Sequence, residues 1–344
     1  MKNKTIILAG GSGFIGQALA AYWGRENRII ILSRGDSRAA NNTYGRKPLS
    51  ARDGYSIRYC HWDGRWDRRL TGERLPNGDR QGGSQAGNDR SSQQWVRELE
   101  GCDLVVNLAG RSVNCRYTAR NRQEIFDSRT DATEAIGEAF RHLVVPPKLW
   151  INITSATIYR HAEDHAQDEY TGEIGEGFSI EVCKRWESCF FSQRTPFTRK
   201  IALRTAIALG DGGVMEPYLR LVRFGLGGRQ GNGRQRFSWV HVEDIAGAIE
   251  WLFDRPELEG VYNMSAPGST SNACFMETLR RLTHTRIGLS APEWLLRLGA
   301  KVAGTETELL LKSRWVAPAK LLDGGFRFRY ERLETALQEI LVNH

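Results

Sequence analysis

The sequence lacks the features that mark secreted, metal-binding and membrane proteins. Its six cysteines are scattered without the spacing of a disulfide framework or a metal site, so we expect reduced thiols and no metal. No segment approaches the roughly 18 to 20 consecutive apolar residues of a membrane helix. The first apolar run, residues 5–9, is too short for a signal peptide and ends in glycines. We therefore expect a cytoplasmic protein with no membrane partner.

Acidic residues are outnumbered, since 48 Lys and Arg against 40 Asp and Glu give a net charge of +8. The arginines are nevertheless spread among acids, and no basic stripe alternates with aromatic residues. This pattern favours a basic surface with a few anion-contacting arginines over a nucleic-acid interface. The 344 residues, 40% of them hydrophobic, suffice for one large or two moderate domains.

The chain is organised around a glycine-rich stretch near its start. Residues 5–9 predict a buried parallel strand, and residues 14–23 predict a helix directly after a tight turn. A helix N-terminus behind such a turn offers free N–H groups and a positive dipole end to a pyrophosphate. The residues that we expect to contact a dinucleotide there are Gly10, Ser12, Gly13, Phe14, Ile15 and Gly16.

The next two strands carry the residues expected to choose the cofactor. Residues 28–32 predict a strand that ends in Ser33 and Arg34, where an NAD-binding protein would place an acid. Because a guanidinium pairs well with a 2′-phosphate, we predict NADP rather than NAD, against the alternative of a solvated loop charge. Asp63, after a strand over residues 55–62, either meets the adenine or forms an Asp-Gly turn.

Strands continue to alternate with helices, which predicts an α/β fold with a doubly wound parallel sheet of the Rossmann type. A strand within residues 103–110 ends in Ala109 and Gly110, whose small size lets a flat ring lie against the backbone, and Leu108 before them is a further cofactor-binding candidate. Further strands are expected over residues 149–153, 199–208 and 260–264, and helices over residues 118–142 and 179–193. The NAD(P)-binding domain is predicted as residues 1–209, with a mobile insert at 64–94 and a core strand and helix from 237–264. Residues 210–344 are predicted to form a smaller C-terminal lobe that binds the substrate.

Four segments then add up to a family resemblance. Residues 9–16, 107–110, 154–159 and 239–244 come in the order and spacing of extended short-chain dehydrogenase/reductases. More narrowly, the chain resembles the NAD-dependent epimerase/dehydratase family and its sugar-nucleotide-epimerase-like branch. The resemblance implies a Rossmann domain for NAD(P) and a lobe for a small, nucleotide-sugar-like substrate. Related folds often form homodimers through two paired helices, and the oligomeric state stays open.

Chemistry in that superfamily rests on a Tyr-x-x-x-Lys pair and a Ser or Thr that holds the substrate oxygen. Ser155 stands where the resemblance places the hydroxyl, but none of the ten tyrosines has a lysine four residues later. With Glu187 as the glutamate that follows the motif, the tyrosine position falls on Ser179 and the lysine position on Cys183. The candidate proton donors are, in order of preference, Cys183, Lys184 and Tyr159.

Each remaining candidate has a structural alternative. Cys183 shares a helix face with Trp186, so it is either an acid or nucleophile or a small packing residue. Arg236 lies near the arginine that holds a substrate diphosphate in extended members of the family, and its alternative is a solvated loop charge. His241 and Asp244 are interpreted as an interface histidine and a helix-capping acid.

The sequence thus predicts an NADP-dependent oxidoreductase or epimerase that acts on a carbonyl or nucleotide-sugar-like substrate. The alternative is a non-catalytic NADP(H)-binding redox sensor or partner-binding module that kept the fold after losing the Tyr–Lys pair.

Overall fold

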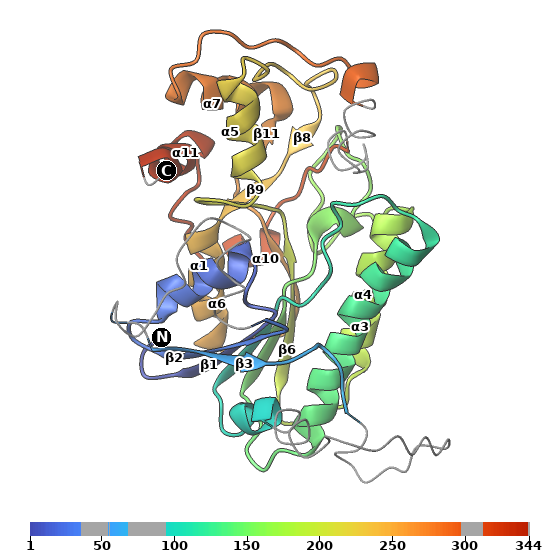
Figure 1. Cartoon of the computed structure of the whole chain (residues 1–344), viewed down its shortest axis with the longest axis vertical. Helices are drawn as coiled ribbons and strands as arrows, with labels where there is room; N and C mark the ends of the chain where they lie inside the picture. Colours follow the sequence, from blue (N-terminus) through green and yellow to red (C-terminus); the bar gives the residue numbers. More distant parts are fainter. Residues whose placement is uncertain (36–53, 55, 68–93, 297–311, 343–344) are drawn as a thin grey trace, which may run out of the picture. The chain divides into compact units, whose positions relative to one another are not determined.

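The computed structural model describes residues 1–35, 54, 56–67, 94–296 and 312–342 (Figure 1). Contacts divide the chain into two compact units, each described by itself below. The first unit comprises Met1–Gly110, Asp127–Asn152 and Ser188–Lys200. The second unit comprises Arg111–Phe126, Ile153–Glu187 and Ile201–His344. The predicted insert at 64–94 lies largely outside the described residues.

A seven-stranded sheet runs in the order β10-β6-β5-β4-β1-β2-β3. The pairs β1–β2, β1–β4, β2–β3, β4–β5 and β6–β10 are all parallel. The strand order reverses direction at β1, which is the switch point where doubly wound sheets bind ligands. The predicted α/β Rossmann fold is confirmed. The strands are β1 (Thr5–Ala9), β2 (Arg28–Ser33), β3 (Ile57–His61), β4 (Leu104–Asn107), β5 (Leu149–Asn152), β6 (Arg199–Thr205) and β10 (Gly260–Met264).

Helices alternate with these strands, as predicted. Figure 1 shows α1 and α3 on opposite sides of the sheet. The helices are α1 (Phe14–Trp23), α3 (Ala119–Arg141), α4 (Phe178–Ser192), α5 (Met215–Arg223), α6 (Val242–Phe253), α7 (Asn272–Leu282), α10 (Ala319–Asp323) and α11 (Leu333–Val342). Residues 94–99 and 293–296 are also helical, and η4 (Ala156–Ile158) is a short 3-10 turn.

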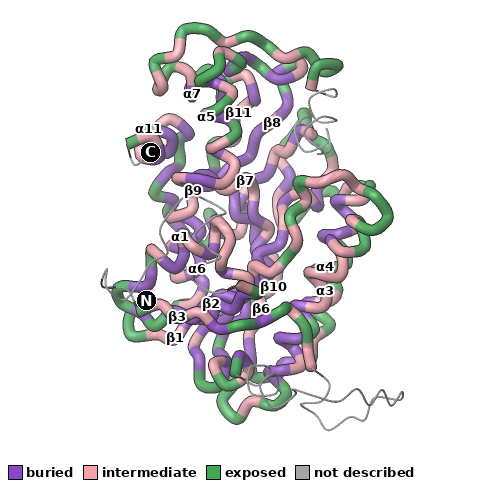
Figure 2. The backbone as a smooth tube through the Cα atoms, viewed as in Figure 1, coloured by how far each residue is buried: buried purple, intermediate pink, exposed green. Residues whose placement is uncertain are grey.

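The central strands form because they are continuous apolar runs that can be covered on both faces. All of β4 and β5 is buried, as are five residues of β2 and four of β1 (Figure 2). In register, Ile7 of β1 pairs with Ile30 of β2 and with Val105 of β4. The sheet core of the first unit is therefore built from local sequence pattern.

The second unit has its own core beside two small sheets. β7 (Ile207–Leu209) pairs parallel with β9 (Trp239–His241), and β8 (Arg236–Phe237) pairs antiparallel with β11 (Thr270–Ser271). Apolar side chains of α5, α7 and α11 pack together there. The predicted strand over residues 199–208 is thus split in two, because β6 belongs to the main sheet whereas β7 pairs with β9 in a separate one.

One interpretation of this region is wrong, and it concerns Asp244. His241 is 1% exposed, its Nδ1 accepts the backbone N–H of Glu243 as the N-cap of α6, and its Nε2 lies 2.9 Å from the carboxylate of Glu339 in α11. Asp244 caps no helix but accepts the backbone N–H groups of Arg329 and Tyr330 at 2.7 and 3.1 Å. Burial lowers the pKa of His241 to about 4 and raises the pKa of Asp244 to about 6. Both side chains therefore tie the C-terminal segment to α6.

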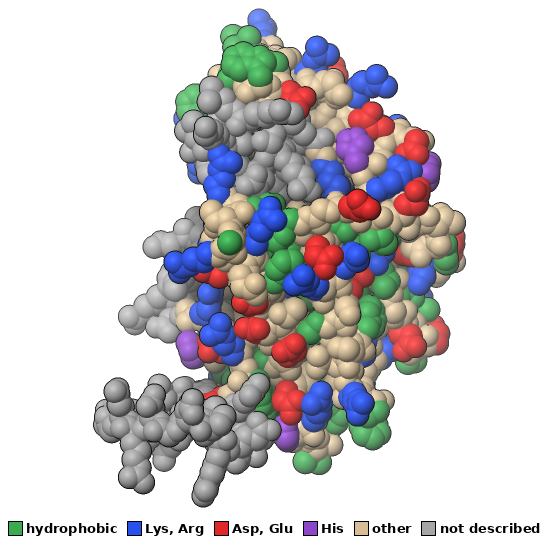
Figure 3. All heavy atoms as spheres, turned by 90° about the vertical axis from the view of Figure 1, so that its right-hand side faces the viewer, with side chains coloured by type: hydrophobic (Ala, Val, Ile, Leu, Met, Phe, Trp, Pro, Cys, Tyr) green, Lys and Arg blue, Asp and Glu red, His purple; other side chains and the backbone are tan. Residues whose placement is uncertain are grey.

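Charged side chains of both signs are interspersed on the face drawn in Figure 3. Within the described ranges, no helix is long and apolar enough to cross a bilayer. The same residues contain no group of three or more His, Cys, Asp or Glu side chains placed to hold a metal ion.

Candidate functional site

In the first unit, the turn after β1 packs tightly against the end of β4. Gly10 has a φ of +72°, and its N–H donates to the carbonyl of Leu32 at 2.8 Å. A Cβ at Gly10 would lie 2.6 Å from the Cα of Ala109, and one at Gly16 would lie 2.4 Å from the Cα of Gly11. Only glycine fits at these two positions, because each would place a side chain inside neighbouring backbone.

Gly13 differs from these two glycines because it faces open space. It is the N-cap of α1, and a Cβ added there would meet nothing within 4 Å. The helix has no side-chain cap and no acid in its first turn. First-turn N–H groups have no acceptor within their own helix, so they and the helix dipole favour an anion at this end. The geometry fits a dinucleotide pyrophosphate.

The two residues expected to select NADP lie at the end of β2. Ser33 is 6% exposed and its hydroxyl donates to the carbonyl of Gly35 at 2.8 Å. Arg34 is exposed and has no acidic partner among the described residues. Asp63 is exposed and accepts the backbone N–H of Arg65 at 2.9 Å, as expected of the turn alternative. An exposed guanidinium at this strand end is open to a 2′-phosphate.

The end of β4 is held in place by buried polar contacts. The side-chain oxygen of Asn107 accepts the N–H of Ala109 at 3.0 Å, and the N–H of Leu108 donates to Ala9 at 2.8 Å. The amide groups of Asn107 and Asn152 both donate to the hydroxyl of Thr133 at 3.4 Å. Leu108, Ala109 and Gly110 thereby form a fixed surface at the carboxyl end of the sheet, beside the turn of Gly10.

In the second unit, the hydroxyl of Ser155 is able to donate a hydrogen bond to a substrate. It is partly exposed and is the N-cap of η4, where its oxygen accepts the N–H of Thr157 at 3.2 Å. Accepting that bond leaves the hydroxyl hydrogen able to donate to a substrate oxygen.

Tyr159, by contrast, is committed to a buried network. It is 2% exposed, and its hydroxyl lies 2.9 Å from the carbonyl of Asp168 and 3.0 Å from the side-chain oxygen of Asn263. Arg204 donates to the same hydroxyl at 2.9 Å and forms a two-pronged ion pair with Glu187 at 2.9 and 2.7 Å. Burial raises the pKa of Tyr159 despite the opposing charge of Arg204. This placement argues for a structural role.

The other two proton-donor candidates also lie in structural surroundings. Cys183 is 4% exposed and belongs to an apolar cluster with Ile158, Ile180 and Val316. Lys184 lies on the outer surface of α4 and pairs with Glu181 at 3.6 Å. Neither placement supplies an argument for proton transfer, and both assignments stay predictions.

A different phenol lies beside Ser179, the residue on which the sequence analysis places the family's tyrosine position. The hydroxyl of Tyr117 is 3.4 Å from the hydroxyl of Ser179, and Tyr117 is only partly buried. Its ring packs edge-on against Phe178 with centroids 4.6 Å apart. The sequence analysis missed Tyr117 because it lies 62 residues before Ser179, outside any Tyr-x-x-x-Lys spacing. An aromatic residue after the Ala-Gly end of a strand is too general a signal to have found it.

Arg236 lines an open pocket of about 460 Å³ in the second unit. Arg229 and Arg234 line the same pocket, and Glu163 is the acidic residue in its lining. Among the described residues, none of the three arginines forms an ion pair, and the guanidinium of Arg236 lies 4.0 Å from the ring centroid of Trp315. The excess of positive charge suits an anionic group of a substrate.

Comparison with known proteins identifies the family. The model of the NAD dependent epimerase/dehydratase family matches residues 6–176. Epimerase family protein SDR39U1 of Mus musculus is 30% identical over 248 residues, covering 70% of this chain and 83% of that protein. The chain belongs to the NAD-dependent epimerase/dehydratase family. A domain of unknown function (DUF1731) also matches residues 291–340 of this family member.

Two further relatives cover almost the whole of this epimerase-family chain. Epimerase family protein YfhF of Bacillus subtilis is 27% identical over 339 residues, 98% of each chain. The crystal structure of human SDR39U1 (isoform 2) with NADPH has a TM-score of 0.75 and 26% identity, covering 99% of this chain and 100% of that one. The family resemblance derived from the sequence is confirmed.

Proposed function

We propose that this epimerase-family protein is an NADP-dependent oxidoreductase or epimerase acting on a carbonyl or nucleotide-sugar-like substrate. The observation that carries the proposal is the open, uncapped start of α1 at Gly13, beside a fixed surface at the end of β4. The NADPH complex of human SDR39U1, a relative that matches over the full length, supports the choice of cofactor.

NADP binding is assigned to the first unit. The N-terminus of α1 would hold the pyrophosphate, and Arg34 would pair with the 2′-phosphate. When bound, the reduced nicotinamide would supply a hydride to the substrate carbon. The basic pocket of Arg229, Arg234 and Arg236 is suited to phosphate groups of a nucleotide-sugar-like substrate.

For the proton, we assign Tyr117 as the donor and Ser155 as the residue that holds the substrate oxygen. Tyr117 would donate its phenolic proton to the substrate oxygen as the carbonyl is reduced to an alcohol, and the phenolate would regain a proton from solvent. The position of Tyr117 beside Ser179 supports this assignment.

Replacing Arg34 by alanine tests the cofactor. We expect NADPH affinity to fall about 10- to 100-fold, because a charge-assisted pair with the 2′-phosphate is lost. NADH affinity should stay unchanged, which makes NADH the internal control. Fluorescence titration with both nucleotides measures the effect. An equal loss for both, or no loss for either, would contradict the role of Arg34.

Replacing Tyr117 by phenylalanine tests the proton donor. We expect kcat to fall at least about 100-fold on a substrate found in a panel of carbonyls and nucleotide sugars, since general acid catalysis is lost. The NADPH dissociation constant should not change. The matched control is Tyr170→Phe, because Tyr170 is exposed and its hydroxyl donates to Asp323. Full turnover by Tyr117→Phe would exclude Tyr117 as the donor.

The sensor or partner-binding alternative is favoured by one observation, which is that Tyr159 and Cys183 are buried in structural surroundings. Tight NADPH binding by the wild-type chain, with no turnover across the whole panel, would support this alternative and overturn the enzyme assignment.

A further inference from the structure

Four large hydrophobic side chains of the second unit lie exposed on the segments that follow α5 and α7. Phe224, Ile287 and Leu289 are 75%, 64% and 62% exposed, and Leu226 is 45% exposed. Single exposed apolar residues are ordinary on a protein surface, whereas a contiguous group of them marks an interaction site. Hydrophobic side chains gather at the upper end of the view in Figure 3, beside Lys and Arg side chains.

A backbone hydrogen bond brings together the two segments that carry these side chains. The N–H of Leu289 donates to the carbonyl of Gly225 at 2.8 Å. A Cβ added at Gly225 would lie 3.3 Å from a methyl carbon of Ile287. Phe224 and Leu226 flank Gly225 in the chain, so the four exposed side chains belong to one surface, which we call the apolar patch.

The apolar patch lies on a framework that is folded without it. On α5, Met215, Tyr218 and Val222 are buried in the core of the second unit at helical spacing. The segment after α5 is fixed to the helix because the N–H of Leu226 donates to the carbonyl of Leu221 at 2.9 Å. Replacing an exposed side chain of the patch should therefore leave the fold intact.

The two segments that form the patch carry positive charge only. Residues 217–231 and 280–292 contain six arginines and no aspartate or glutamate. Arg223 and Arg286, which directly precede patch residues, are exposed, and neither forms an ion pair with a described residue. Cations beside exposed apolar side chains are typical of membrane-surface sites, where the charges meet anionic headgroups and the apolar groups reach the acyl boundary.

These features favour a lipid surface over a protein partner. A partner helix binds in an apolar groove, whereas the three most exposed side chains of the patch stand out from the surface. Insertion into a bilayer surface needs only such protruding apolar groups with cations around them. Contact between two copies through this patch is disfavoured, because a two-fold interface would bring two equally positive surfaces together.

We propose that the apolar patch binds the surface of an anionic lipid bilayer. Phe224, Ile287 and Leu289 would enter the headgroup region, and Arg223 and Arg286 would pair with lipid phosphates and carboxylates. The sequence analysis expected no membrane partner because no segment is long enough to span a bilayer, but binding at the surface requires no spanning segment. This inference does not rest on the proposed reaction.

The probe is a phosphatidylcholine vesicle with about 30% phosphatidylserine, and a vesicle of pure phosphatidylcholine is the uncharged comparison. Co-sedimentation of the full chain measures binding at about 0.1 M salt. We expect at least about tenfold stronger binding to the anionic vesicles than to the uncharged ones. Raising the salt to about 1 M should remove most of this difference, because the charges are then screened within about 3 Å.

Two variants, each with a matched control, test the two parts of the patch. Phe224→Ser should weaken binding to the anionic vesicles about tenfold, because a buried aromatic ring is lost from the bilayer surface. Arg223→Gln should weaken it about fivefold, since one cation facing the lipid is lost. The controls Phe197→Ser and Arg194→Gln should change nothing.

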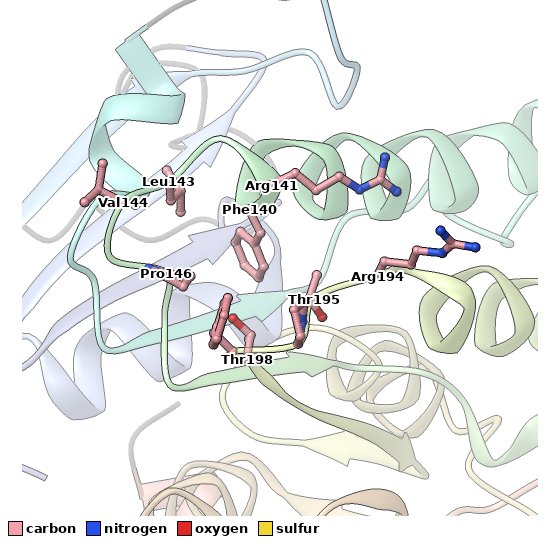
Figure 4. Close-up of a pocket in the computed structure, with 10 residues that line it drawn as sticks. Phe140, Arg141, Leu143, Val144, Pro146, Arg194, Thr195 and Thr198 are labelled. Atoms are coloured by element: carbon pink, nitrogen blue, oxygen red, sulfur yellow. The ribbon is translucent and has the colours of Figure 1, made fainter.

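The two controls lie in the first unit, where Phe197 and Arg194 line a pocket of about 300 Å³ (Figure 4). Phe197 is 82% exposed, close to the value of Phe224, and Arg194 is exposed like Arg223. Each pair therefore makes the same chemical change at a similarly exposed position. All four variants should keep the melting temperature of the wild type.

Four results would overturn the proposal. The first is no co-sedimentation with anionic vesicles at about 0.1 M salt. The second is equal binding to anionic and uncharged vesicles. The third is a loss in Phe224→Ser or Arg223→Gln no greater than in its control, which would place the lipid contact elsewhere. The fourth is a dimer of the lipid-free chain in sedimentation velocity that Phe224→Ser dissociates, which would make the patch an interface between two copies.

Discussion

Replacing Gly13 by aspartate is expected to weaken NADPH binding about 100-fold or more while the fold keeps its stability. A Cβ added at Gly13 meets nothing within 4 Å, and aspartate is a better N-cap than glycine, so the substitution should not destabilise the fold. The new carboxylate would occupy the place of the pyrophosphate, and two like charges about 4 Å apart at an effective dielectric of about 20 repel by about 4 kcal/mol. Titration of NADPH fluorescence measures the loss.

Gly13→Asn is the matched control, since asparagine has the same shape without the charge. It should retain a larger share of the affinity than Gly13→Asp, and urea unfolding should show both variants at least as stable as the wild type. NADPH binding by Gly13→Asp with unchanged affinity would show that the pyrophosphate lies elsewhere. The cofactor assignment would then fail as a whole.

The second large effect is expected at the buried ion pair of the second unit. The side chains of Arg204 and Glu187 are 12% and 10% exposed, and Glu187 also accepts the hydroxyl of Thr154 at 3.1 Å. Arg204→Met keeps an unbranched apolar stem but leaves a carboxylate buried without its cation. We expect the free energy of unfolding to fall by about 3 kcal/mol, measured by urea unfolding.

The double variant Arg204→Met/Glu187→Met separates the ion pair from packing. It should lose less stability than Arg204→Met alone, because removing both charges leaves no uncompensated carboxylate. Lys184→Met is the exposed control, since Lys184 and Glu181 are 54% and 43% exposed, and it should cost less than about 1 kcal/mol. A loss in Arg204→Met no greater than in this control would contradict the structural role of the pair.

Much of the fold could be predicted because its signals are local. The runs at residues 5–9 and 28–32 are apolar enough to be strands by themselves, and β1 and β2 match them to within one residue. Glycines at positions 10 and 16 predict that another backbone segment passes close by. The structure shows this, because a Cβ at either position would meet neighbouring backbone atoms. Prediction was less accurate for residues 199–208, since no local signal marks where a strand leaves one sheet for another.

The site of the second unit could not be predicted in the same way. The sequence offered Tyr159 because of its motif, but Arg204 and Asn263, 45 and 104 residues away, enclose its hydroxyl together with the nearby carbonyl of Asp168. Asp244 suggested a cap by its place in the sequence, yet its partners lie 85 and 86 residues away. Such contacts depend on long-range packing, which the spacing of residues along the sequence does not predict.

The sequence by itself determined the family, the parallel sheet and the glycine turn before α1, because strand, turn and helix follow one another within about twenty residues. Only the tertiary structure decided which hydroxyl groups are buried. The hydroxyl of Tyr159 lies in a buried hydrogen-bond network, and that of Tyr117 lies beside Ser179. The physical reason is that a backbone turn is specified by its own residues, whereas the surroundings of a side chain are specified by whatever the fold packs against it.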